Sequence, residues 1–230
     1  MAGMIVGPST YWYLTRATGA VALLLLTASV VIGIAAIARL RSHRTPRFVV
    51  DGVHRTASLL AVMFLVVHII TAVLDSFAPI SLVNAVIPFT GSYRPVWLGL
   101  GAVGFDLQLA VTVTSLMRRR VGHRAWRGVH WLAYLSWPVA VVHGFGTGSD
   151  VRDTWLLAID AVCIVAVLGA VVIRVVIGWP DNLRIRLGAL GLAAAFALGL
   201  LVWLPGGPLG KGWARRSGTP PALLSHGARA

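Results

Sequence analysis

Two apolar stretches bounded by histidines decide the fold of this chain: HRTASLLAVMFLVVH at residues 54–68 and HWLAYLSWPVAVVH at residues 130–143. Between its histidines the first stretch carries one charge, Arg55, and the second carries none. A helix that crosses a bilayer needs about 20 predominantly apolar residues. With their apolar flanks both stretches reach that length, so we expect each to lie in a transmembrane helix.

The whole chain has the composition of a membrane protein. Of its 230 residues 57% are hydrophobic and 12% are charged, and the mean hydropathy is +0.82. Soluble domains are about 45–50% apolar and about 25% charged. These values argue against a soluble globular enzyme. The single cysteine, Cys163, excludes an internal disulfide, an iron–sulfur cluster and a covalently attached c-type haem.

Six spans account for the apolar segments. We place them at about 11–38, 52–74, 95–117, 128–146, 154–177 and 187–204. The predicted fold is therefore all-α, a polytopic membrane bundle of about six transmembrane helices. We expect no room beside them for a soluble catalytic domain, which typically needs about 100 residues. The Pro-, Gly- and Ser-containing segment 205–230 is predicted to be a disordered polar tail.

The net charge is +13, and the basic residues are concentrated in the loops between the spans. The clusters are Arg39, Arg41, Arg44 and Arg47 in the first loop, Arg118, Arg119, Arg120, Arg124 and Arg127 in the third, and Arg174, Arg184 and Arg186 around the fifth. Cytoplasmic loops carry an excess of Lys and Arg, so these three loops are predicted to be cytoplasmic and both termini to lie outside. We expect a multi-pass protein of a bacterial plasma membrane that contacts lipid and binds no nucleic acid.

Four histidines inside the predicted spans form two levels. His54 and His68 are separated by about 21 Å of helix, and His130 and His143 by about 19.5 Å. Because the second and fourth spans run in the same direction, His54 lies level with His130 and His68 level with His143. An ionisable residue inside a membrane span is a functional candidate by default. Two facing imidazoles are the axial ligand set of a b-type haem.

Helical phase supports only the first of these spacings. At about 100° per residue, 14 steps end about 40° short of whole turns, so His54 and His68 share a face. Thirteen steps end about 140° short, so His130 and His143 do not share a face on a regular helix. Pro138 lies between them and can kink or rewind the span. We therefore expect a distortion there, or a steep helix crossing, to bring the second pair into register.

The two histidine-bounded stretches together resemble the ferric-reductase-like transmembrane domain. This family includes NADPH oxidases, ferric reductases and the haem-binding membrane subunit of bacterial methionine sulfoxide reductase systems. The resemblance covers about residues 11–174. It implies two haem b groups in a haem-binding transmembrane domain at 1–204, with one iron held by His54 and His130 and the other by His68 and His143. It also implies electron transfer across the membrane, usually from a cytoplasmic flavin.

The chain differs from the larger members of this family. It carries no nucleotide-binding fingerprint, and a sixth span stands where their FAD and NADPH domains would follow. We therefore expect the haem-binding membrane subunit of an oxidoreductase. Its electron donor would be a separate flavoprotein or quinol, and its extracytoplasmic acceptor a flavin, molybdenum or iron centre. Two alternatives are a quinone-linked cytochrome b that anchors a dehydrogenase, and a haem-free small transporter or assembly factor.

Other polar residues are candidates for supporting roles. Haem propionates prefer arginine partners. The candidates are Arg55 and Arg127 for the cytoplasmic haem and Arg16 and Arg94 for the outer one. The alternative for all four is anchoring to lipid phosphate. Within the spans, Asp106 and Asp160 either relay protons or pair with arginine, or else remain protonated and hydrogen-bonded.

Overall fold

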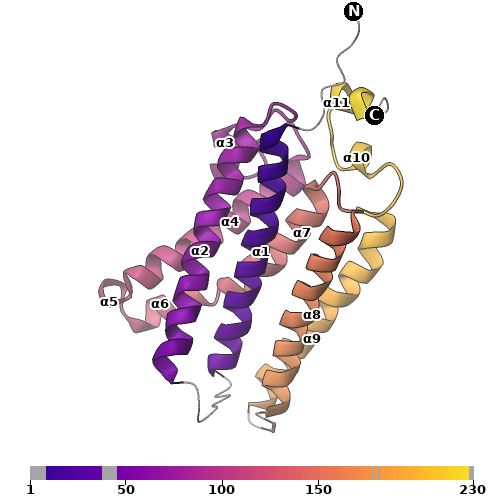
Figure 1. Ribbon diagram of the computed structural model, residues 1–230. Helices are drawn as coiled ribbons and strands as arrows, with labels where there is room; N and C mark the ends of the chain where they lie inside the picture. The colour runs from indigo at the N-terminus through magenta and orange to yellow at the C-terminus, as the bar shows by residue number, and fades with distance from the viewer. Residues whose placement is uncertain (1–8, 38–45, 178, 181, 228–230) are drawn as a thin grey trace, which may run out of the picture.

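The computed structural model describes residues 9–37, 46–177, 179–180 and 182–227, and the described chain is all-α, without a strand (Figure 1). Its helices are α1 (Thr10–Ile37), α2 (Arg47–Leu74), α3 (Leu82–Val86), α4 (Pro95–Leu116), α5 (Arg118–Val121), α6 (His123–His130), α7 (Ala133–Thr147), α8 (Thr154–Ile177), α9 (Leu183–Gly206), α10 (Trp213–Arg216) and α11 (Pro221–Gly227). Arg39, Arg41 and Arg44 of the first predicted loop lie outside the described residues.

The prediction of an all-α polytopic bundle is confirmed. Within the described residues, five helices are long and apolar enough to cross a membrane: α1, α2, α4, α8 and α9. The expected fourth span is not one continuous helix, because it is divided into α6 and α7 by a turn at Trp131 and Leu132. Most of the predicted span, from residue 133 to 146, belongs to α7, and only residues 128–130 belong to α6. The arginine-rich third loop is also largely helical, since it forms α5 and part of α6.

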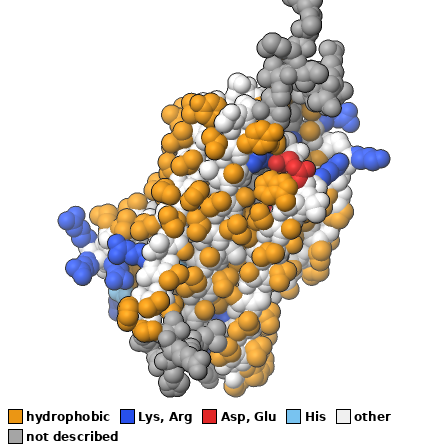
Figure 2. Space-filling model, in the orientation of Figure 1, with side chains coloured by type: hydrophobic (Ala, Val, Ile, Leu, Met, Phe, Trp, Pro, Cys, Tyr) orange, Lys and Arg blue, Asp and Glu red, His pale blue; other side chains and the backbone are white. Residues whose placement is uncertain are grey.

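The long helices pack side by side around a small core. α1 lies along α2, α4 packs against α7, and α8 contacts both α1 and α9. The core comprises Val30, Ile34, Trp137, Val141, Phe145, Cys163, Val167 and Leu200. Large apolar side chains cover much of the outer surface as well (Figure 2), and Leu192 and Val202 on α9 are 76% and 81% exposed. Such a surface suits contact with lipid chains, where burial in a protein core is not needed.

The two ends of the bundle differ. At the upper end in Figure 1, α1 begins, α2 ends, and α3, α10 and α11 are gathered. At the lower end, α1 ends and α5 and α6 project sideways. Figure 2 shows basic side chains gathered over the α5–α6 projection. "Upper end" and "lower end" are used below in this sense.

The segment after α9, which we expected to be disordered, is structured over its described part. It turns back onto the upper end, where the Trp213 indole N–H donates to the Gly146 carbonyl (3.2 Å) and the Arg94 backbone N–H donates to the Gly218 carbonyl (3.0 Å). The Trp213 ring also lies 5.1 Å from the ring of Trp97. The amino-acid composition of this segment does not predict the docking, because the docking depends on one indole and on backbone groups. Residues 228–230 of the predicted tail lie outside the described part of the chain.

Candidate functional site

The four intramembrane histidines lie on three helices and form two pairs. α2 carries His54 and His68, α6 ends on His130, and α7 carries His143. The ring centroids of His54 and His130 are 6.3 Å apart, and those of His68 and His143 are 6.4 Å apart. The structure thus brings together the residues that their spacing pairs. The His54–His130 pair (the lower pair) lies toward the lower end, and the His68–His143 pair (the upper pair) toward the upper end.

The separation within each pair fits one metal ion between two imidazoles. A first-row metal lies about 2.0 Å from an imidazole nitrogen, which is itself about 1.15 Å from the ring centre, so two rings on one ion have centroids about 6.3 Å apart. Each pair offers only two ligands, and a haem macrocycle supplies the other four of an octahedral iron. Among the described residues, no three His, Cys, Asp or Glu side chains gather into a site for a bare metal ion. A haem is therefore the group that this donor set fits.

Three of the four rings are fixed through Nδ1 by a backbone carbonyl of a neighbouring helix. The acceptors are Ser29 for His54 (3.0 Å), Thr15 for His68 (2.8 Å) and Trp97 for His143 (2.8 Å). A carbonyl can only accept, so Nδ1 carries the proton and donates. The lone pair of Nε2 is then free for a metal, and the ring orientation is set in advance. These bonds are the support that metal-binding histidines ordinarily have.

Two glycines of α1 allow this helix to approach the rings on α2. A Cβ at Gly19 would lie 3.0 Å from the ring of His68, and a Cβ at Gly33 would lie 3.4 Å from the ring of His54. The two glycines are 14 residues apart, as the two histidines are. Sequence reasoning missed them, although this repeated interval was available as a signal. Their role is to let the Ser29 and Thr15 carbonyls come within hydrogen-bonding distance.

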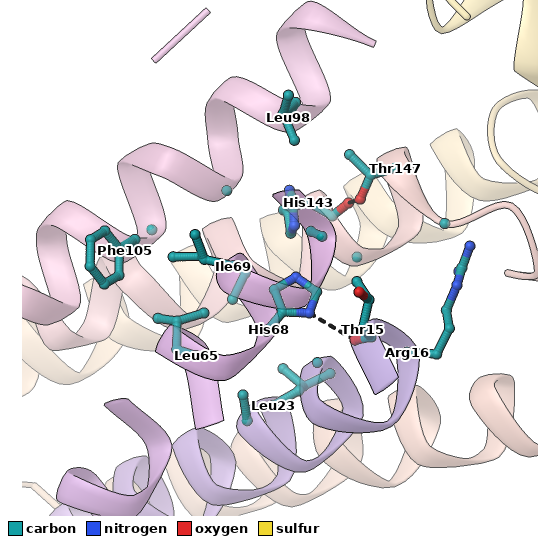
Figure 3. A pocket seen from close by; sticks show the side chains of 18 of the residues that line it. Thr15, Arg16, Leu23, Leu65, His68, Ile69, Leu98, Phe105, His143 and Thr147 are labelled. Atoms are coloured by element: carbon teal, nitrogen blue, oxygen red, sulfur yellow. Dashed lines mark hydrogen bonds between the residues drawn. The ribbon is translucent and has the colours of Figure 1, made fainter. Parts of the chain in front are cut away.

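The rings of the upper pair face each other across a cavity of about 280 Å³ (Figure 3). Apolar side chains that surround them include Leu23, Leu65, Ile69 and Phe105. An apolar cavity with a few convergent polar groups is the usual form of a cofactor site. The cavity therefore adds an environment for a flat apolar macrocycle to the two ligands.

Arg16 is the one predicted outer arginine that lines this cavity. Its guanidinium forms an ion pair with Asp150, a hydrogen bond with Ser149, and lies 4.7 Å from the centre of the Trp12 ring. The Asp150 side chain is 9% exposed, and its second carboxylate oxygen is buried with no protein partner among the described residues. Arg16 thus lies at the edge of the cavity that holds the upper pair, with Asp150 as its counter-ion.

Arg94 is used differently, because it holds the upper end together. It is 3% exposed, and its guanidinium donates to the carbonyls of Gly146, Thr147 and Gly148 at the end of α7 and to the Thr219 hydroxyl. Burial lowers the pKa of Arg94, an effect that Tyr93 partly opposes, and the guanidinium nevertheless stays charged. Arg94 is absent from the residues that line the cavity. The structure therefore places it at the C-terminus of α7 and not beside the upper pair.

We expect replacement of Arg94 by alanine to lower the free energy of unfolding by about 2–4 kcal/mol. The change leaves the Thr147 and Gly148 carbonyls without this donor, while the Gly146 carbonyl keeps the Trp213 indole N–H. An unsatisfied buried polar group costs about 1–3 kcal/mol. The matched control is Arg152→Ala, which removes one exposed bond to the Gly210 carbonyl and should cost less than about 0.5 kcal/mol. Thermal unfolding in detergent compares the two. Equal midpoints for both variants would contradict this role for Arg94.

The two predicted arginines of the lower end, Arg55 and Arg127, are both exposed. They follow and precede the lower pair closely in sequence, one residue after His54 and three before His130. The exposed Arg118, Arg119, Arg120 and Arg124 lie on the same projection as Arg127. The lower pair is therefore next to a strongly basic surface. The upper end carries a smaller set of exposed basic residues, Arg152, Lys211, Arg215 and Arg216.

The turn between α6 and α7 reduces the angular mismatch between His130 and His143. Hydrogen bonds of the i to i−3 type run from Leu132 to Val129, from Tyr134 to Trp131 and from Leu135 to Leu132. Each residue of such a 3₁₀ turn advances about 120° instead of about 100°, so four residues add about 80° and reduce the mismatch from about 140° to about 60°. Pro138 lies inside the continuous α7. The expected distortion exists, but it precedes Pro138.

Comparison with known protein families finds one family that covers most of the paired histidines. The profile of the family described as "Ferric reductase like transmembrane component" matches residues 17–141, which is more than half of the chain. The chain belongs to this family. The matched part of this ferric-reductase-like protein includes three of the paired histidines and ends two residues before His143. No curated protein and no solved structure matches it significantly. Members of the family bind haem, and membership indicates electron transfer within a membrane.

Proposed function

We propose that this ferric-reductase-like chain is a di-haem b protein that passes electrons from a cytoplasmic donor to an extracytoplasmic acceptor. His54 and His130 would hold the lower haem, and His68 and His143 the upper one. The observation that carries this proposal is the pair of ring separations, 6.3 and 6.4 Å, which both match two imidazoles on one iron. The carbonyl-anchored Nδ1 atoms of three rings support it independently.

The residues of the chain would orient and insulate these groups. A bound haem supplies reversible one-electron chemistry at its iron. The Ser29, Thr15 and Trp97 carbonyls hold their imidazoles so that Nε2 is presented without reorganisation. Apolar side chains such as Leu65 and Phe105 would limit the contact of water with the upper pair. Arg16 would neutralise a propionate at the upper end in competition with Asp150.

The charge distribution suggests the direction of transfer. Under the positive-inside rule the basic α5–α6 projection faces the cytoplasm, so the lower pair would accept electrons and the upper pair would release them outside. A separate flavoprotein with an acidic surface suits that projection as donor, and a quinol is the alternative donor. The acceptor at the upper end would be a flavin, molybdenum or iron centre of another protein or of its substrate.

The experiment that tests the proposed function is the visible spectrum of the purified full-length protein. We expect a b-type spectrum after reduction with dithionite and two haems per chain in a pyridine haemochrome assay. Proteoliposomes that contain ferricyanide should then oxidise an external impermeant reductant, and empty liposomes should not. A colourless protein, made with haem supplied during expression, would overturn the proposal and leave a haem-free transporter or assembly factor to be tested.

The proposed orientation predicts opposite labelling of two engineered cysteines. In a Cys163→Ser background, Asp153→Cys at the upper end should react with a membrane-impermeant maleimide on intact cells. Arg119→Cys on α5 should react only after the cells are opened, because the basic projection is expected inside. Both positions are exposed, so accessibility within the protein is matched. The reverse pattern would place the basic surface outside and reverse the direction of electron flow.

A further inference from the structure

The four histidines are not supported equally. His54, His68 and His143 each donate from Nδ1 to a carbonyl at 2.8–3.0 Å. The Nδ1 atom of His130 is buried, and no hydrogen-bond partner reaches it among the described residues. The lower pair is therefore asymmetric, with one anchored ring and one ring that lacks an anchor.

The position of His130 in the fold adds to this difference. The other three histidines lie inside long helices, whereas His130 is the last residue of the eight-residue α6, directly before the 3₁₀ turn at Trp131 and Leu132. Glycines of neighbouring helices press against the other three rings, but no glycine that the structure describes lies within contact distance of the His130 ring. Among the described residues, neither a hydrogen bond from Nδ1 nor a close glycine contact therefore fixes its orientation.

One aromatic contact holds the ring instead. The indole of Trp126 stacks on the imidazole of His130 with centroids 5.1 Å apart and planes at 28°. Trp126 is in turn held by a hydrogen bond from its indole N–H to the Ser115 hydroxyl (3.2 Å). Stacking has no single donor–acceptor direction, whereas a hydrogen bond from Nδ1 fixes the direction of Nε2.

We infer that His130 is the exchangeable ligand of the lower pair, and that a small neutral molecule of the carbon monoxide class can take its place. The inference rests on the proposed function, since it needs an iron between His54 and His130. Loss of the hydrogen-bond partner of a metal-binding histidine typically lowers metal affinity about 10- to 100-fold. The His130 bond should be weaker by that factor than the other three, while the upper pair remains closed to added ligands.

Carbon monoxide is the probe for this inference, with the full-length protein reduced by dithionite in lipid nanodiscs. We expect a carbon monoxide difference spectrum that accounts for one of the two haems per chain. The double variant His68→Ala/His143→Ala, which keeps only the lower pair, should bind one carbon monoxide per haem. The double variant His54→Ala/His130→Ala, which keeps only the upper pair, should show no carbon monoxide spectrum.

A second set of variants applies even if the double variants do not fold. Trp126→Ala should increase the rate of carbon monoxide association about tenfold, because the ring of His130 loses its stacking partner, and Trp126→Phe should change it less than twofold. Trp12→Ala, which alters the upper cavity, should leave the rate unchanged. Two haems per chain with no carbon monoxide binding, or binding by the upper-pair variant, would overturn the inference and leave the di-haem proposal standing. A protein without haem would overturn both.

Discussion

Replacing His68 with alanine should halve the haem content of the purified protein, from two haems per chain to one. The cavity around the upper pair would keep its shape but offer only His143 as a ligand. Losing a ligand should reduce haem affinity at this site by more than about 100-fold, which is the upper range for losing only a hydrogen-bond partner of a ligand. The pyridine haemochrome assay, expressed per chain, measures the ratio.

The control for this variant is a histidine outside both pairs. His123 is exposed at the start of α6 and belongs to neither pair. His123→Ala should therefore keep two haems per chain. Both variants should reach the membrane in equal amount, because His123 lies outside the spans and alanine at position 68 keeps α2 apolar. Two haems retained in His68→Ala would contradict the assignment of the upper pair.

Adding a single methyl group at Gly101 should remove the upper haem almost as effectively. A Cβ at this position would overlap the imidazole of His143, whose Nδ1 is held by the Trp97 carbonyl on the same helix α4. The ring can move away only by giving up that bond and with it the direction of Nε2. Overpacking of this kind typically costs about 1–3 kcal/mol, so the Gly101→Ala variant should also unfold at a lower temperature.

The same helix offers a matched control three residues away. A Cβ at Gly104 would lie 3.6 Å from a methyl group of Val139, which is an ordinary contact distance. Gly104→Ala should therefore keep both haems and a nearly unchanged unfolding temperature. If Gly101→Ala and Gly104→Ala bind equal amounts of haem, the close approach of α4 to His143 has no role in ligand placement.

The sequence was sufficient for five of the predicted spans and for the pairing of the histidines, because both depend on features that act along one helix. Length and apolarity select membrane spans, and the intervals 54–68 and 130–143 set the depths of the four rings. The supports of those rings could not be predicted in the same way. The acceptors at Ser29, Thr15 and Trp97 are backbone carbonyls, which every residue has, so only the packing of neighbouring helices selects them.

The structure differs from the sequence-based expectations in two other places. The distorted turn lies just before Pro138, which has no N–H to donate to the Tyr134 carbonyl four residues earlier. The C-terminal segment looks disordered by composition, yet it is held by the docking of Trp213 and by Arg94, whose donors reach backbone groups far away in the sequence. Arg94 could be identified as a candidate residue from its position near a span end, but not as the cap of α7.

The tight turn after α6 also makes the His130–His143 separation nearly equal to the His54–His68 separation. In the regular α2, the 14 steps between its histidines rise about 21 Å, at about 1.5 Å per residue. Between His130 and His143, about nine α-helical steps and four 3₁₀ steps rise about 21.5 Å, since a 3₁₀ residue rises about 2.0 Å. The 14 steps of α2 and the 13 steps from His130 to His143 therefore give nearly equal separations between the histidines. Inserting or deleting one residue in either interval would leave one pair aligned and displace the partners of the other by about 1.5–2 Å. We therefore expect a change in one interval to need a matching change in the other.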